Sequence, residues 1–148
     1  MKSAASETLA TEQTWESAIE ALGLGSVAAM LEDHTTALAK EMLGGEAVRL
    51  ERAVWMGLPV FFVAGAGAPV EVSAPGEGNC IGVTPLLAGL AITAHAAEYL
   101  YFGSDSRFAV AKKVKAFKYL VQAEAMRHAS AVMGAAASEY EELLGLDW

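Results

Sequence analysis

The sequence contains a single cysteine, Cys80, among its 148 residues. One cysteine excludes an internal disulfide and a zinc cluster built on several thiolates. Nucleotide-binding loops are missing as well, because the glycine-rich stretches GEGNCIG and VAGAGAP fit neither G-x-x-x-x-G-K-[ST] nor G-x-G-x-x-G. The chain therefore lacks the sequence patterns of the commonest phosphate-binding sites.

Charged residues are also scarce, at 19% of the chain, whereas hydrophobic residues make up 54% and the mean hydropathy is +0.34. Monomers seldom expose large apolar patches, so burial of apolar surface between subunits would reconcile this composition with solubility. We therefore expect a homo-oligomer, either a dimer or a higher assembly. The alternative is an alanine-rich helical monomer, because alanine raises the hydropathy without requiring much burial.

The formal net charge is -8 and the sequence pI is near 4.8, which argues against nucleic acid as a partner. The basic residues are nevertheless clustered, with half of the ten lysines and arginines between positions 107 and 118. Such a run is usually a solvated helix face, and the alternative is a docking surface for an acidic partner such as the acidic end of another copy. The basic run consists of Arg107, Lys112, Lys113, Lys115 and Lys118, and the acidic end of Glu139, Glu141, Glu142 and Asp147.

Neither apolar segment of the sequence has the character of a membrane span. The segment 54–68 is broken by Pro59 and by glycines, and the segment 85–102 carries His95 and Glu98 at the short end of spanning length. The first residues lack the apolar core of a signal peptide. We therefore expect a cytoplasmic protein without a membrane partner.

The apolar periodicity predicts one mostly helical α+β domain, residues 1–148, in which residues 1–10 are flexible. Glycines end the predicted helices, and serine, threonine or proline residues begin several of them. β-branched and aromatic runs cut by glycine and proline indicate a small β element with two strands. The predicted helices are about 11–22, 26–43, 46–55, 85–102 and 106–144; the predicted strands are 59–64 and 70–73, followed by an irregular loop at 74–83.

A central antiparallel helix pair organises this expected fold. The helix at 85–102 is apolar on nearly every side and should therefore lie inside the molecule. The long last helix folds back on it at the Gly103-Ser104-Asp105 turn. Two strands are too few to stand alone, so we expect them to pack on helices or to pair across a dimer interface.

Two polar residues, Glu124 and His128, interrupt the apolar stripe of the last helix. They are four residues apart and can hydrogen-bond to each other. A carboxylate on an apolar face must be paired, protonated or bound to a metal, because an isolated buried charge is very costly. The simplest interpretation is a pair that satisfies itself in the core or at an interface.

A second pair, His95 and Glu98, invites a helical-bundle metal site together with Glu124 and His128. In an antiparallel pair that turns near residue 104, however, a rise of 1.5 Å per residue separates the two histidines by about 20 Å. No complete ligand set converges within one subunit, so we predict no cofactor. A metal site would have to recruit His34, Glu32 or Asp33, or be shared between chains.

In the same antiparallel helix pair, Cys80 lies at the same height along the helix axis as His128. It precedes the helix that begins at Pro85. A thiol near a helix N-terminus and a histidine has a lowered pKa, as a nucleophilic cysteine requires. His128 would then be the base and Glu124 the carboxylate that orients it. The alternative is a small buried cysteine that closes a loop.

The leading functional hypothesis is a non-catalytic oligomeric protein that acts in structure, assembly or regulation through its helical surfaces. Scarce polar side chains and the lack of a convergent catalytic set favour it. The alternative is a small enzyme or ligand-binding protein with a polar pocket near Cys80, Glu124 and His128, working through the thiol or through a metal held by carboxylate and histidine.

Overall fold

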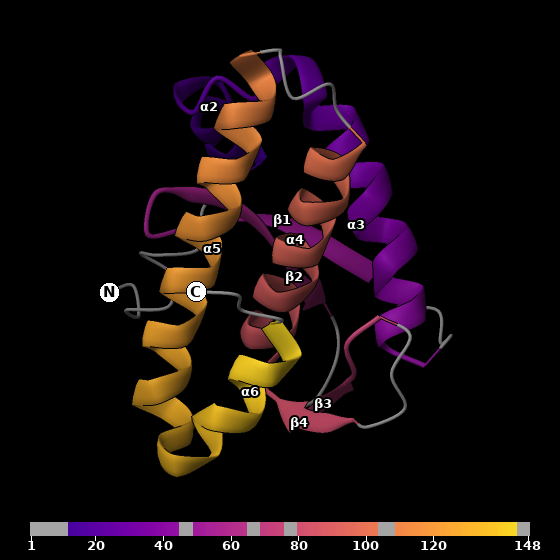
Figure 1. Ribbon diagram of the computed structural model, residues 1–148, viewed down its shortest axis with the longest axis vertical. Coiled ribbons are helices and arrows are strands. Elements are labelled where there is room, and N and C mark those ends of the chain that lie inside the picture. The colour runs from indigo at the N-terminus through magenta and orange to yellow at the C-terminus, as the bar shows by residue number, and fades with distance from the viewer. Residues whose placement is uncertain (1–11, 45–48, 65–68, 76–79, 104–108, 145–148) are drawn as a thin grey trace.

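The computed structural model describes residues 12–44, 49–64, 69–75, 80–103 and 109–144 (Figure 1). The flexible start predicted for residues 1–10 lies outside these ranges. Within them the protein is a mostly helical α+β structure, as predicted. The elements are α2 (Glu12–Ala21), η1 (Gly25–Val27), α3 (Ala28–Met42), β1 (Arg49–Trp55), β2 (Leu58–Ala64), β3 (Val70–Val72), β4 (Ile81–Val83), α4 (Pro85–Phe102), α5 (Ala109–Met133), η2 (Gly134–Ala136) and α6 (Ala137–Leu144).

The central element is α4, which packs against α3, α5, α6 and β2 (Figure 1). Its start follows the predicted capping pattern: the Thr84 hydroxyl accepts a hydrogen bond from the Leu87 amide, and Pro85 occupies the first turn. Every residue from Leu87 to Ala97 is buried. The predicted antiparallel pair of α4 and α5 is confirmed. Although α4 is apolar, no helix in the described ranges has both the length and the hydropathy of a bilayer-spanning segment.

The segment 49–55 is a strand, and the prediction of a helix over 46–55 is wrong there. β1 pairs antiparallel with β2 through a turn of two residues, Met56 and Gly57, with φ of 51° and 80°. Positive φ at both central positions is the geometry of the tightest hairpins, and glycine favours it. Pairing with β2 outweighs the local preference of this segment, because strand formation depends strongly on tertiary partners.

The structure contains two small antiparallel sheets in the described ranges, not the single two-stranded element that was predicted. The predicted strands correspond to β2 and β3, but each pairs with a different neighbour: β2 with β1, and β3 with β4. β4 lies at 81–83, inside the region predicted to be an irregular loop. β4 is only three residues long, and it forms a strand because it pairs with β3.

The last helix is interrupted, whereas the sequence predicted one helix to Leu144. Gly134 has φ of 59°, a left-handed conformation that ends α5, and the chain continues through η2 into α6. α6 folds back onto the outer side of α4. The Tyr140 hydroxyl donates to the Leu87 carbonyl at 2.6 Å, and His95 Nε2 lies 2.8 Å from the Leu143 carbonyl oxygen.

Gly89 allows α4 to lie unusually close to β2. A Cβ atom at this position would lie 1.9 Å from the Phe61 carbonyl oxygen and 2.5 Å from the Phe62 Cα. One turn later the Thr93 hydroxyl accepts a hydrogen bond from the Phe61 amide at 3.3 Å and donates to the Gly89 carbonyl at 2.7 Å. The buried amide of Phe61 in β2 is thus satisfied by a side chain of the helix.

We predict that Gly89→Ala destabilises the protein by at least about 2 kcal/mol, because backbone atoms must move to admit the methyl group. Helix propensity alone would favour alanine by about 1 kcal/mol, so the sign of the change tests the contact. Urea unfolding monitored by circular dichroism measures it. Gly25→Ala is the control, since nothing lies within 4 Å of the added atom. A neutral or stabilising effect at Gly89 would contradict the close approach.

Candidate functional site

The predicted pair of Glu124 and His128 does not form a mutual hydrogen bond within the described part of the chain. Glu124 Oε2 instead accepts from Arg127 at 2.7 and 2.9 Å. The His128 ring packs edge-on against Trp55 from the β1–β2 hairpin, with ring centroids 4.9 Å apart. Burial, followed by the charge of Arg127, lowers the pKa of His128 from its ordinary value of 6.5, which favours the neutral imidazole.

Cys80 lies exposed immediately before β4. The alternative of a small buried cysteine is therefore wrong. Across the described ranges, no group of three or more histidine, cysteine, aspartate or glutamate side chains is placed to hold a metal ion. The contacts recorded for Glu124 and His128 favour structural roles for both.

His95 and Glu98 lie near each other, as their spacing predicted, but each has a second partner. His95 is buried, with Nδ1 3.9 Å from Glu98 Oε2 while Nε2 reaches the end of α6. Glu98 Oε1 also accepts a hydrogen bond from Lys118 Nζ of α5 at 3.5 Å. The pair thus links α4 to both α5 and α6, and its histidine joins α6 to the core.

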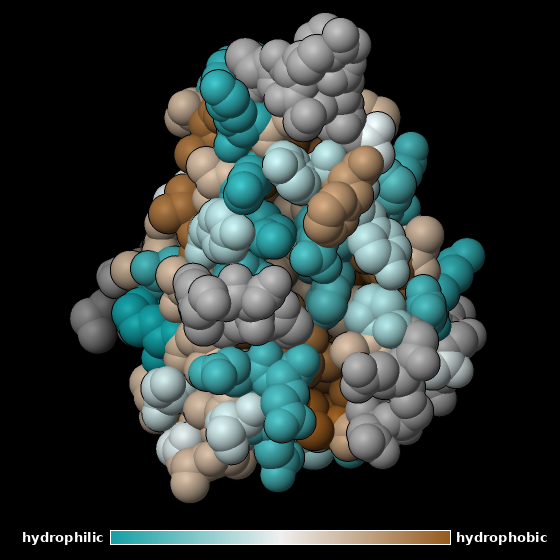
Figure 2. All heavy atoms as spheres, in the orientation of Figure 1, coloured by the Kyte–Doolittle hydropathy of each residue, from teal (hydrophilic) through white to brown (hydrophobic). Residues whose placement is uncertain are grey.

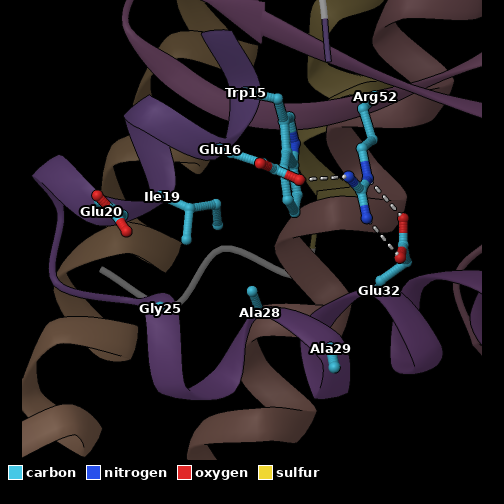
Figure 3. A pocket seen from close by; sticks show the side chains of 9 residues that line it. All are labelled: Trp15, Glu16, Ile19, Glu20, Gly25, Ala28, Ala29, Glu32 and Arg52. Carbon is cyan, nitrogen blue, oxygen red and sulfur yellow. Dashed lines mark hydrogen bonds and ion pairs between the residues drawn. The ribbon is translucent and has the colours of Figure 1, made fainter. Parts of the chain in front are cut away.

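An open cleft of about 380 Å³ lies between α2, the start of α3 and β1 (Figure 3). Arg52 of β1 lies at one edge of the cleft, beside Trp15 (Figure 3). Its guanidinium donates to both carboxylate oxygens of Glu32 at 2.9 Å and lies 4.4 Å from the centre of the Trp15 ring. The cleft is lined by Trp15, Glu16, Ile19, Glu20, Gly25, Ala28, Ala29, Glu32 and Arg52.

The Arg52 contacts connect three elements of the fold. A planar guanidinium can grip a carboxylate with two parallel hydrogen bonds while its face rests on an aromatic ring. Glu16 approaches the same group at 3.5 Å. The hydrogen bonds and charge of Arg52 lower the pKa of Glu32 despite partial burial. Because its donors are directed at protein carboxylates, Arg52 acts first as a brace between β1, α2 and α3.

The prediction from sequence missed this brace because Arg52 was assigned to a helix. A signal for the correct structure was present: Gly57 lies between two runs rich in β-branched and aromatic residues, a pattern typical of a short hairpin. In a strand, Arg52 and Val54 lie on one face, and Ala53 and Trp55 on the other. The partner Glu32 is 20 residues away, and only the tertiary structure identifies it.

A second candidate site is an exposed surface at the last turn of α4 and the first half of α5. Phe102 is 73% exposed and Tyr99, three residues earlier on the same side of the helix, is 44% exposed. Lysines of α5 lie among the aromatic rings: Lys115 Nζ is 5.6 Å from the centre of Tyr101, and Lys118 Nζ is 4.8 Å from that of Tyr119. We call this surface the aromatic–lysine face; it comprises Tyr99, Tyr101, Phe102, Lys112, Lys115 and Tyr119, and the largely buried Lys118 lies at its inner margin.

The exposure of this face follows from the length of α6. An apolar helix requires cover on all sides, and α6 covers the outer side of α4 near Leu87 and His95. The last turn of α4 lies beyond those contacts. Hydrophilic residues gather over the upper halves of α4 and α5 in the space-filling view (Figure 2).

The predicted basic run is only partly on this face. Lys112 and Lys115 are exposed, whereas the Lys118 side chain is 12% exposed beside Glu98. Lys113 lies against the turn after α2, because its Nζ is 2.7 Å from where a Cβ of Gly23 would be. Arg107 lies outside the described residues.

Comparisons with known proteins give no relative: no family model, no curated protein and no solved structure matches this chain.

We predict that Glu32→Gln destabilises the protein by about 1 kcal/mol at pH 7, since a partly exposed bidentate pair lies at the upper end for surface ion pairs. Folding lowers the pKa of Glu32 below 4.5, so its contribution is fully present above that value and is lost as the pH falls through the folded pKa. The difference between wild type and variant should therefore be nearly constant from about pH 7 to about pH 5 and should shrink as the pH falls below 4.5.

Unfolding free energies measured across this pH range test the Glu32 prediction. The control is Asp33→Asn, the exposed neighbour on the same helix, which should leave stability nearly unchanged. A difference for Glu32→Gln that is constant with pH would show that the carboxylate charge contributes nothing to the brace.

Proposed function

We propose that this chain is a non-catalytic, homo-oligomeric assembly protein and that the aromatic–lysine face is its self-association surface. The observation that supports this most directly is the exposure of Phe102 and Tyr99 at the end of a helix that is otherwise covered. Aromatic residues are enriched at protein interfaces, where their large surface is removed from water. A cytoplasmic location is part of the proposal and rests on the single cysteine.

The energetics favour association at this face. Burying one large apolar side chain contributes about 1.5–3 kcal/mol, so two aromatic rings can offset a useful part of the entropy lost on dimerisation. The lysines around them have flexible aliphatic stems that can cover apolar surface while their charges meet an acidic partner. The face thus combines exposed aromatic rings with lysines that contact Tyr101 and Tyr119.

The alternative of an enzyme built on Cys80, Glu124 and His128 is less well supported. Glu124 is engaged by Arg127, and His128 packs against Trp55. Neither contact orients the imidazole as a base toward a thiol. The Arg52 cleft is open to a ligand, but its arginine is held by Glu32 and Trp15. Self-association therefore remains the function that the described contacts favour.

We predict that the wild-type protein is a dimer or higher oligomer and that Phe102→Ser combined with Tyr99→Ser weakens association more than tenfold, since tenfold corresponds to about 1.4 kcal/mol. Sedimentation equilibrium over a range of protein concentrations gives the dissociation constant. Both residues are exposed, so the folded subunit should keep its circular dichroism spectrum.

The matched control is Val132→Ser, which changes another exposed apolar residue, 52% exposed and near the opposite end of α5. It should leave association unchanged. A monomeric wild-type protein would overturn the proposed function. Equal effects of the double variant and the control on the dissociation constant would show that the aromatic–lysine face is not the self-association surface.

A further inference from the structure

The outer surface of α6 carries charge of the opposite sign to the aromatic–lysine face. Ala137, Tyr140, Leu143 and Leu144 are buried against the core, whereas Glu139, Glu141 and Glu142 are exposed. No lysine or arginine lies in α6. This helix therefore presents three carboxylates outward, as the acidic end of the sequence predicted; Asp147 lies outside the described residues.

The two charged surfaces lie on the same side of the molecule, one at its upper end and the other in its lower half (Figure 1). In Figure 1 the end of α4 and the start of α5 are at the top, and α6 lies over the lower part of α4. Figure 2 shows hydrophilic residues at both places on the face turned to the viewer. One face thus has a basic, aromatic end and an acidic end.

We propose that two copies of the chain form a dimer in which the aromatic–lysine face of each contacts α6 of the other. This inference rests on the proposed self-association and names its partner surface. A twofold axis that lies in the interface, perpendicular to the long axis, reverses one copy relative to the other. The basic end of each copy then faces the acidic end of its partner, and the same contact occurs twice in a closed dimer.

The spacing of the charges suits this pairing. Lys112 and Lys115 are three residues apart on the exposed side of α5, and Glu139 and Glu142 are three apart on α6. Residues at this spacing are neighbours on one side of a helix, so two lysines can meet two glutamates along a pair of crossing helices. The neighbouring Phe102 supplies apolar contact that charge pairs alone would lack. Rim charges of this kind fix orientation and register more than they raise affinity.

Charge reversal tests the pairing. The lysine variant carries Lys112→Glu and Lys115→Glu, and the glutamate variant carries Glu139→Lys and Glu142→Lys. Each variant alone places like charges opposite each other at both contacts, and we expect its dimer to dissociate at least about tenfold more readily than wild type. An equimolar mixture should form a heterodimer of near wild-type affinity, because both contacts then join opposite charges.

The controls keep the net charge of each variant. Lys40→Glu with Arg49→Glu matches the lysine variant, and Glu41→Lys with Glu71→Lys matches the glutamate variant; all four positions are exposed and lie outside both surfaces. The controls should dimerise as wild type does. Sedimentation equilibrium gives the affinities, and mixing a fluorescently labelled variant with its unlabelled counterpart reports heterodimer formation.

The outcomes separate this inference from the proposed function. Recovery of association only in the mixture supports the reciprocal contact. Variants that remain oligomeric with wild-type affinity, or a mixture that stays dissociated, overturn the pairing with α6 while the proposed self-association stands. A wild-type protein that sediments as a monomer overturns both.

Discussion

The close contact between α4 and the backbone of β2 positions the rest of the structure. A helix with a side chain at position 89 could not approach Phe61 as it does. That approach buries one side of α4 on the hairpin and leaves its other sides to α3, α5 and α6. Trp15 then reaches the same strand from α2, with its indole nitrogen donating to the Val60 carbonyl at 3.1 Å. The helices are therefore arranged around β2, which α4 contacts at van der Waals distance.

The sequence was most informative where a physical requirement is local. A threonine and a proline define the start of α4, and the uniform apolarity of that helix requires a central position. The basic run at 107–118 and the acidic end at 139–147 could also be recognised directly in the sequence. By contrast, the segment 49–55 contains residues suited to either a helix or a strand, and the choice depends on β2, which follows it. Short apolar runs of this kind cannot be assigned by periodicity alone.

The candidate sites were harder to predict, because they depend on partners distant in the sequence. Glu124 and His128 have the spacing for a direct contact, but Arg127 offers Glu124 a stronger, charged donor three residues away. His128 meets Trp55 across 73 positions (128 − 55), which no local pattern encodes. The exposure of Phe102 likewise depends on where α6 ends its cover of α4, and this follows from the interruption at Gly134.

The return of α6 onto α4 has a consequence for the growing chain. The two hydrogen bonds that join these helices span 48 and 53 residues. The outer side of α4 therefore remains exposed until α6 has been synthesised. Translation proceeds at about 5–20 residues per second, which leaves this apolar surface open for several seconds in each nascent chain. Nascent chains at that stage would expose a longer apolar stripe than the finished subunit does.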